Sequence, residues 1–198
     1  MMTPARRPLA ALVLAASLTG AGCLGRSAAT RLYVLAPAET TAARSAASLS
    51  VGLGPVSVPV YLDRPQLVTR PAADRIELSE LDQWAEPLRD GITRVLAEDL
   101  AGHMRSVKVA IYPWRSQESI HYQVVVDISR LDSPAGGDLA FEAQWRVLDL
   151  AGKEVAEKTT RLAEPTGGPG YSATVSAMSR ALAALSRDMA EVLTALPR

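Results

Sequence analysis

The sequence predicts a single α+β domain, in which two amphipathic helices pack on one side of a mostly antiparallel sheet. Several segments alternate apolar and polar residues, as half-buried strands do, and two others repeat apolar residues every three or four positions, as helices do. A predicted leader takes 22 of the 198 residues, and the remaining 176 suffice for one ordinary domain with a single core.

The N-terminal segment has the organisation of a secretory signal. Arg6 and Arg7 supply positive charge, and the apolar run from Leu9 to Leu18 is too short to span a bilayer comfortably. Small residues at positions 20–22 then precede Cys23, which is the pattern that lipidating and cleaving enzymes accept. We therefore predict a lipoprotein signal peptide over residues 1–22.

Cys23 is the only cysteine, so an intramolecular disulfide cannot form and acylation best explains its position. The alternative is an ordinary signal peptide that leaves Cys23 as a free thiol, since Gly20 stands where lipoprotein signals usually carry Leu. Residues 23–30 would form a lipidated tether, and 31–198 the folded domain. Leu24, rather than an acidic residue, follows the cysteine, which favours the outer membrane in a cell with two membranes.

The first part of the domain reads as strands followed by a helix. Residues 31–35 predict a short strand, and 49–60 predict a long one that bends at Gly54, with Pro59 indicating a sheet edge. Residues 76–81 are a short extended piece. Helical spacing predicts an amphipathic helix over 87–103, beginning at a proline.

The second part reads as a meander of strands followed by a long helix. Alternation predicts strands over 107–112, 121–131, 139–150 and 154–162, separated by turn residues. Apolar residues from Val175 to Leu196 then recur every three or four positions. This helix could pack on its own sheet or against a partner helix, and its own sheet is the default.

Composition and motifs argue against several classes of function. The first 22 residues hold two of the 21 basic residues and no acidic one, so the mature chain has 19 basic against 21 acidic residues, a formal charge of −2. This balance does not favour a nucleic acid partner. Two histidines, His103 and His121, and one cysteine provide neither zinc spacing nor a serine nucleophile elbow. We expect no enzyme activity, no metal and no cofactor.

For two other sets of residues a structural role is the simpler interpretation. Asp127, Asp132 and Asp138 lie near one hairpin and could be imagined as calcium ligands, but no EF-hand pattern is present and carboxylates are common at turns. The three tryptophans could offer stacking platforms, but each more simply covers an edge of the core. Trp145, in phase with Phe141, belongs to the core.

Two motifs carry a family resemblance. The stretches VSVPVYLDRPQLVTR, residues 56–70, and IELSELDQWAEPLRDGITRVLAEDL, residues 76–100, resemble the ABC-type transport auxiliary lipoproteins. These lipoproteins accompany paraquat-inducible and other MCE-type transport systems. The similarity spans nearly all of the mature chain, including Tyr33 to Leu35 in the opening strand.

The resemblance implies a non-enzymatic subunit of a system that moves lipids or other hydrophobic molecules across the cell envelope and so contributes to membrane integrity. The resemblance implies an MCE-domain protein as the partner. A homo-oligomer at the end of the conduit through which the transported molecules would pass is a further option. The lipid anchor would hold the domain so that it faces the periplasm. The residues assigned to partner binding are Tyr61, Leu62, Asp63, Arg64, Pro65 and Trp84. The alternative is a membrane-tethered periplasmic carrier that binds an acyl chain itself, whereas an envelope hydrolase fits least.

Overall fold

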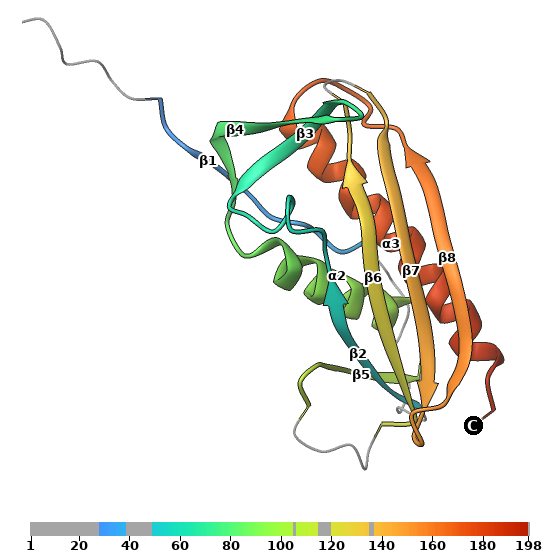
Figure 1. Ribbon diagram of the computed structural model, residues 1–198. Helices are drawn as coiled ribbons and strands as arrows, with labels where there is room; N and C mark the ends of the chain where they lie inside the picture. Colours follow the sequence, from blue (N-terminus) through green and yellow to red (C-terminus); the bar gives the residue numbers. More distant parts are fainter. Residues whose placement is uncertain (1–27, 39–48, 105, 115–119, 135–136, 198) are drawn as a thin grey trace, which may run out of the picture.

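The computed structural model describes residues 28–38, 49–104, 106–114, 120–134 and 137–197, and Figure 1 shows their arrangement. These residues form two helices and eight strands in two sheets, so the α+β prediction is confirmed. Residues 1–27, and with them the predicted signal peptide and Cys23, lie outside the described residues.

The larger sheet contains five strands in the order β5-β2-β6-β7-β8. The bounds of these strands in chain order are Leu49–Ser57 (β2), Val107–Ile111 (β5), Tyr122–Asp132 (β6), Leu139–Asp149 (β7) and Glu154–Glu164 (β8). The last three form the expected antiparallel meander, but β2 runs parallel to both β5 and β6. The edge inferred from Pro59 is wrong, because β2 lies inside the sheet and ends before that residue, where a missing amide costs no ladder hydrogen bond.

A second sheet of three strands was not predicted. It has the order β1-β4-β3, with β1 at Arg31–Tyr33, β3 at Gln66–Ala72 and β4 at Arg75–Trp84. β1 runs parallel to β4, whereas β3 and β4 form a hairpin. The amide of Arg70 donates to the carbonyl of Ser133 at 3.0 Å, which joins this sheet to the end of β6.

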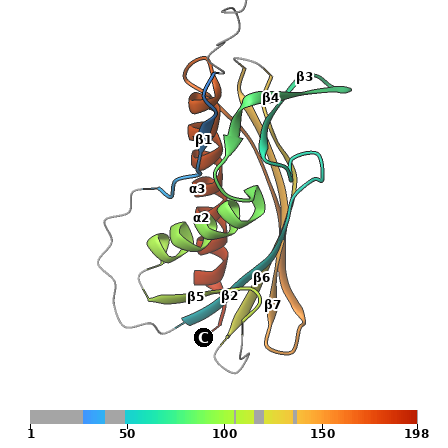
Figure 2. The same cartoon turned by 90° about the vertical axis from the view of Figure 1, so that its left-hand side faces the viewer.

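Both helices, α2 (Leu88–His103) and α3 (Tyr171–Ala195), cover the same face of the five-stranded sheet, as Figure 2 shows. The apolar stripe that predicted α2 is buried, and the longer stripe of α3 is buried with it. Both helix predictions are therefore confirmed. Neither helix is long and apolar enough to cross a membrane, within the part of the chain that the structure describes.

Trp145 is fully buried between the sheet and α3, as predicted. Its indole Nε1 donates to the hydroxyl of Thr160 at 3.1 Å, and that hydroxyl donates to a carboxylate oxygen of Asp188 at 2.7 Å. The chain of hydrogen bonds satisfies the one polar atom of the buried indole and ties β7 and β8 to α3.

Gly54 produces the bend that the sequence suggested in β2. Its φ is +115°, a conformation that side chains rarely adopt, and the pairing with β6 shifts register between Leu53 and Val56. A Cβ atom at this position would also lie 2.9 Å from the Cβ of Tyr112. Glycine is therefore required here by both conformation and contact.

Replacing Gly54 with Ala should lower the free energy of unfolding by about 2 kcal/mol, because strain and a steric clash act together. Urea denaturation followed by circular dichroism would measure this loss. Gly152→Ala is the matched control, since Gly152 has φ of +75° but open space around the added methyl group. An equal loss in both variants would show that the contact with Tyr112 adds nothing.

Candidate functional site

Pro65 of the first motif segment and Trp84 of the second meet at one corner of the fold. The amide of Trp84, at the end of β4, donates to the carbonyl of Pro65 at 2.7 Å. Together they enclose a surface pocket of about 330 Å³, which we call the motif pocket. Its lining residues are Asp63, Arg64, Pro65, Trp84, Ala85, Glu86 and Pro87.

Local sequence explains why the chain turns so sharply on both sides of this pocket. The carbonyl of Pro59 accepts from the amide of Leu62 at 2.9 Å, which closes a turn after β2. The side chain of Leu62 is buried in the core and anchors that turn. On the other side, Pro87 precedes the first residue of α2, where a missing amide proton costs no helical hydrogen bond.

Arg64, which lines the motif pocket, has a side-chain nitrogen without a hydrogen-bond partner in the described part of the chain. Its Nε is buried yet has no hydrogen-bond partner among the described residues, although the residue itself is only half-buried. Asp63 next to it forms an ion pair with Arg89 of α2, so the neighbouring carboxylate is already engaged. A buried donor without a partner is costly, so a movement of the half-buried side chain that brings this donor to a carbonyl or carboxylate of another molecule would be favourable.

Tyr61 points away from the motif pocket and contacts Asp132 at the end of β6. Its hydroxyl donates to Asp132 Oδ2 at 2.6 Å, and Arg70 Nε donates to the same oxygen at 3.0 Å. The Arg70 guanidinium also lies 4.9 Å from the centre of the Tyr61 ring. Arg130 donates to the second oxygen of Asp132 at 3.2 Å, so this fully buried carboxylate has partners on both oxygens.

The environment keeps Tyr61 and Arg70 in their ordinary protonation states. Burial, and then the hydrogen bond to Asp132, raise the pKa of Tyr61. The hydrogen bonds to Tyr61 and to Asp132 raise the pKa of Arg70. Tyr61 is therefore a neutral structural donor rather than an acid or base that works near neutral pH.

A second buried carboxylate, Asp82, fixes the N-terminal strand. Asp82 is 2% exposed and accepts from Arg31 through both oxygens, at 2.6 and 2.8 Å. The hydroxyls of Tyr33 and Ser79 also donate to it, at 2.8 and 2.7 Å. β1 contains only three residues, so these side-chain bonds supply much of what holds it against β4.

The hydrogen bond from Arg31 holds the pKa of Asp82 well below its ordinary value, with those from Ser79 and Tyr33 adding to the effect. A carboxylate whose pKa is lower when folded stabilises the fold above its unfolded pKa, near 4, and loses that contribution as pH falls further. We therefore expect the stability difference between wild type and Asp82→Asn to be largest at neutral pH and to shrink below about pH 4. Urea unfolding of both proteins from pH 7 to pH 3 would measure it, and a difference independent of pH would contradict this assignment.

After β1 the chain crosses the two helices, and three side chains bind its backbone. Arg94 Nη2 of α2 donates to the carbonyl of Leu35 at 3.0 Å, and the amide of Ala36 donates to Ser179 Oγ of α3 at 3.1 Å. The amide of Ala38 donates to the buried carboxylate of Asp99 at 2.7 Å. We call residues 34–38 the strap, because they connect β1 to both helices.

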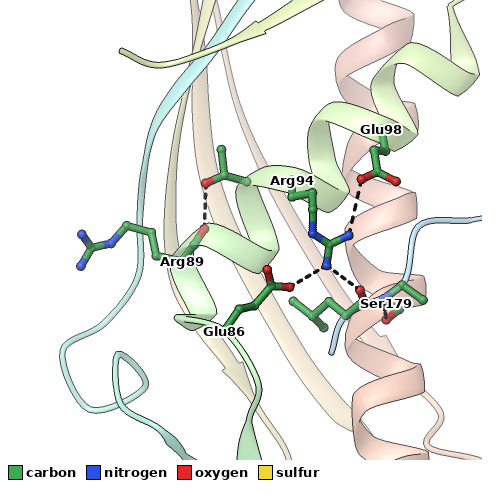
Figure 3. A network of polar contacts seen from close by, with 8 residues as sticks. Glu86, Arg89, Arg94, Glu98 and Ser179 are labelled. Carbon is green, nitrogen blue, oxygen red and sulfur yellow. Dashed lines mark hydrogen bonds and ion pairs between the residues drawn. The ribbon is translucent and has the colours of Figure 1, made fainter. Parts of the chain in front are cut away.

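Arg94 couples the strap to the motif pocket. Figure 3 shows its guanidinium between Glu86, at the pocket, and Glu98, one turn further along α2. The hydrogen bond to Glu86 Oε1 is 2.6 Å long, and it raises the pKa of Arg94 more than any other contact. The pocket wall, α2 and the strap therefore share one network of polar contacts centred on Arg94.

A larger surface pocket of about 560 Å³ lies beside the motif pocket and shares Glu86 with it. Its lining comes from the ends of β2 and β5 and from the first half of α2. Part of the wall is apolar, from residues such as Val56 and Ile111, but four charged side chains of the α2 region also line it. They are Glu86, Arg89, Asp90 and Arg94.

The structure therefore divides the six residues that the sequence assigned to partner binding. Four of them line the motif pocket: Asp63, Arg64, Pro65 and Trp84. Leu62 belongs to the core, and Tyr61 belongs to the buried contact with Asp132. Sequence reasoning missed Glu86, whose signal was its place beside a helix-starting proline in the second motif.

Two further candidates from the sequence, His121 and Asp127, have structural roles. His121 Nδ1 accepts the amide of Ser50 at 3.0 Å, at the start of the parallel β2–β6 pairing. Asp127 accepts from the hydroxyl of Ser57 at 2.6 Å, in the middle of β6 rather than at a turn. No three histidine, cysteine or carboxylate side chains lie close enough to hold a metal ion among the described residues.

Solved structures share this fold at low sequence identity. A crystal structure titled as an uncharacterized protein has a TM-score of 0.70 and 17% identity, with 84% of this chain and 99% of that chain covered. Protein XCC0632 from Xanthomonas campestris, a DUF330 family protein, has a TM-score of 0.64 and 17% identity, covering 80% and 92% of the two chains. A search of curated protein sequences gave no match.

The fold and the motif pocket together define an α+β domain with a preformed surface pocket between the β2–β3 loop, the end of β4 and the segment that leads into α2. The family model of the ABC-type transport auxiliary lipoprotein component matches residues 33–190. The chain therefore belongs to this family, as the two motifs indicated, and its class of function is that of an auxiliary component of ABC-type transport.

Proposed function

We propose that this chain is a non-enzymatic, lipid-anchored subunit of an MCE-type ABC transport system that moves lipids or other hydrophobic molecules across the cell envelope. Acyl groups on Cys23 would tether the domain to the outer membrane, facing the periplasm. The motif pocket would be the surface at which an MCE-domain protein docks. Family membership supports the transport role, and the docking role rests on the pocket.

The observation that carries the docking proposal is the meeting of both family motifs at one pocket with an unsatisfied donor. Arg64 Nε has no partner among the described residues, and Arg64 lines the pocket together with the tryptophan that ends β4. Arginine and tryptophan are among the side-chain types that most often dominate binding energy at protein interfaces, although Trp84 is 8% exposed and also packs in the core. Arg64 Nε is one of six buried side-chain polar atoms without a partner among the described residues, and Arg64 alone of those six residues lines the motif pocket.

The alternative function, a carrier that shields an acyl chain itself, needs an apolar cavity of suitable size. The space between the sheet and the helices is occupied by fully buried side chains, among them Leu53, Leu96, Trp145 and Leu182. The larger surface pocket has charged residues along its α2 wall, which an acyl chain would have to desolvate. These features favour docking over carrying.

Co-purification of the MCE-domain protein with the full-length lipoprotein tests this proposal. Arg64→Ala should reduce the recovered partner about tenfold or more, the usual effect of losing one dominant interface side chain. Arg187→Ala, at an exposed position of α3, is the matched control and should leave recovery unchanged. Thermal unfolding of both variants would confirm that they are folded, and equal recovery from folded variants would exclude Arg64 as a docking residue.

A further inference from the structure

The position at which the tether enters the fold is fixed. The Arg31–Asp82 ion pair and the hydroxyl of Tyr33 hold β1, and three hydrogen bonds hold the strap that follows it. Figure 1 shows β1 and the three-stranded sheet toward the end of the molecule where β6 and β8 end, whereas the β7–β8 turn lies at the opposite end. A tether attached at Arg31 therefore pulls on a defined end of the domain.

The tether is short compared with the domain. Residues 24–30 separate Cys23 from Arg31, so the two Cα atoms can be at most about 28 Å apart. By comparison, β7 alone, with 11 residues, is about 35 Å long. An acylated Cys23 would thus keep the three-stranded sheet near the bilayer and would prevent the β7–β8 turn from facing it.

Exposed aliphatic side chains gather on the same end. Four of the nine large hydrophobic residues that are exposed in the described part of the chain belong to the small three-stranded sheet or directly follow β1. They are Leu32 at 64% exposed, Val34 at 54%, Ile76 at 36% and Leu78 at 43%. The other five lie elsewhere: Val60 between β2 and β3, the adjacent Ile111 and Tyr112 at the end of β5, and Leu150 and Val155 in the β7–β8 hairpin, which the short tether keeps away from the bilayer.

We propose that this end of the domain, formed by β1 and the β3–β4 hairpin, rests on the lipid surface to which Cys23 is anchored. The inference depends on the acylation in the proposed function. β1 and β3 are both sheet edges, so their backbone groups restrict the contact to the interfacial layer rather than the hydrocarbon core. The tether raises the local concentration of the surface at the bilayer, so that a few aliphatic side chains suffice to set the orientation.

Charges on the hairpin indicate which lipids this surface can accept. Asp74, Glu77 and Glu80 are exposed near the two hairpin aliphatics, and Arg75 already pairs with Glu77 at 3.2 Å. An acidic hairpin gains nothing from anionic headgroups. The contact should therefore form on zwitterionic lipid.

Depth-dependent fluorescence quenching on the full-length lipoprotein tests the proposed orientation. Acylation occupies the only native thiol, so Leu78→Cys and Leu150→Cys each provide a unique site for an environment-sensitive fluorophore. Leu150 is 70% exposed at the β7–β8 turn and serves as the distant control. In phosphatidylcholine vesicles containing spin-labelled phosphatidylcholine, we expect at least about twofold stronger quenching at position 78 than at position 150.

Three outcomes would overturn the inference. Equal quenching at both positions would mean that the domain lies on its side, and quenching at neither would mean that it stands clear of the bilayer. Protection of position 78 from an aqueous quencher without quenching by lipid would show that a second copy or another protein covers this end. Mass spectrometry of the same sample distinguishes failure of the proposed anchor from failure of the proposed orientation. Absence of acylation contradicts the anchor, whereas acylation without quenching contradicts only the orientation.

Discussion

Replacing Asp132 with Asn is expected to lower the free energy of unfolding by about 3 kcal/mol, the low end of the range for breaking a buried ion pair. Asp132 is fully buried, and its carboxylate accepts from Tyr61, Arg70 and Arg130. The amide NH2 group that replaces one carboxylate oxygen would face another hydrogen-bond donor. The Arg70 guanidinium would also lose its counter-charge. Because Arg70 keeps some contact with solvent, the loss should not reach the upper end of the range.

Asp127→Asn is the matched control for this prediction. Asp127 is also on β6, but it is exposed, and its carboxylate accepts a hydrogen bond from the hydroxyl of Ser57. Its replacement should change the stability by less than about 0.5 kcal/mol. Urea unfolding of the three proteins at neutral pH measures the difference, and similar losses in both variants would mean that the Tyr61 contact does not hold the first motif in place.

The second large effect is expected from Cys23→Ala. Without the thiol no acyl group can be attached, so the amount of protein in the membrane fraction should fall by at least about tenfold. Fractionation of cells and mass spectrometry of the mature N-terminus measure the two consequences. An unchanged distribution would support the ordinary signal peptide, with Cys23 as a free thiol.

Leu24→Asp provides the control for this second prediction. It keeps the cysteine and should leave acylation intact, but in a cell with two membranes it should move the protein from the outer to the inner membrane. Loss of membrane association in this variant would show that the residue after Cys23 affects processing rather than sorting.

The helices and the meander could be predicted because their signals are local. In α2 and α3 the apolar stripe is continuous, and in β7 alternate residues from Leu139 to Val147 are buried, so periodicity alone specifies the element. β3 could not be recognised in this way. Leu67, Val68 and Thr69 are consecutive and all buried, and a register shift on either side of the Val68–Thr69 pair breaks the alternation.

The parallel pairings of β2 were missed for a different reason. β2 lies next to β5 and β6, which follow it by more than 50 residues, and no local pattern specifies such partners. The site was predicted only in part for the same reason. Arg64 and Trp84 were chosen as motif residues, but their shared pocket depends on the contact between Pro65 and Trp84, which the unrecognised pairing of β3 with β4 brings together. The pairing of Tyr61 with Asp132, 71 residues later, was likewise invisible.

Site-specific photo-crosslinking in cells tests the docking proposal most directly. A photoreactive amino acid would replace Ala85, which is exposed in the motif pocket, and Thr159, which is exposed on β8, would be the control position. We predict that illumination links position 85, but not position 159, to an MCE-domain protein identified by mass spectrometry. Crosslinks to that protein from position 159 alone, or from neither position in a folded and acylated lipoprotein, would contradict docking at the motif pocket.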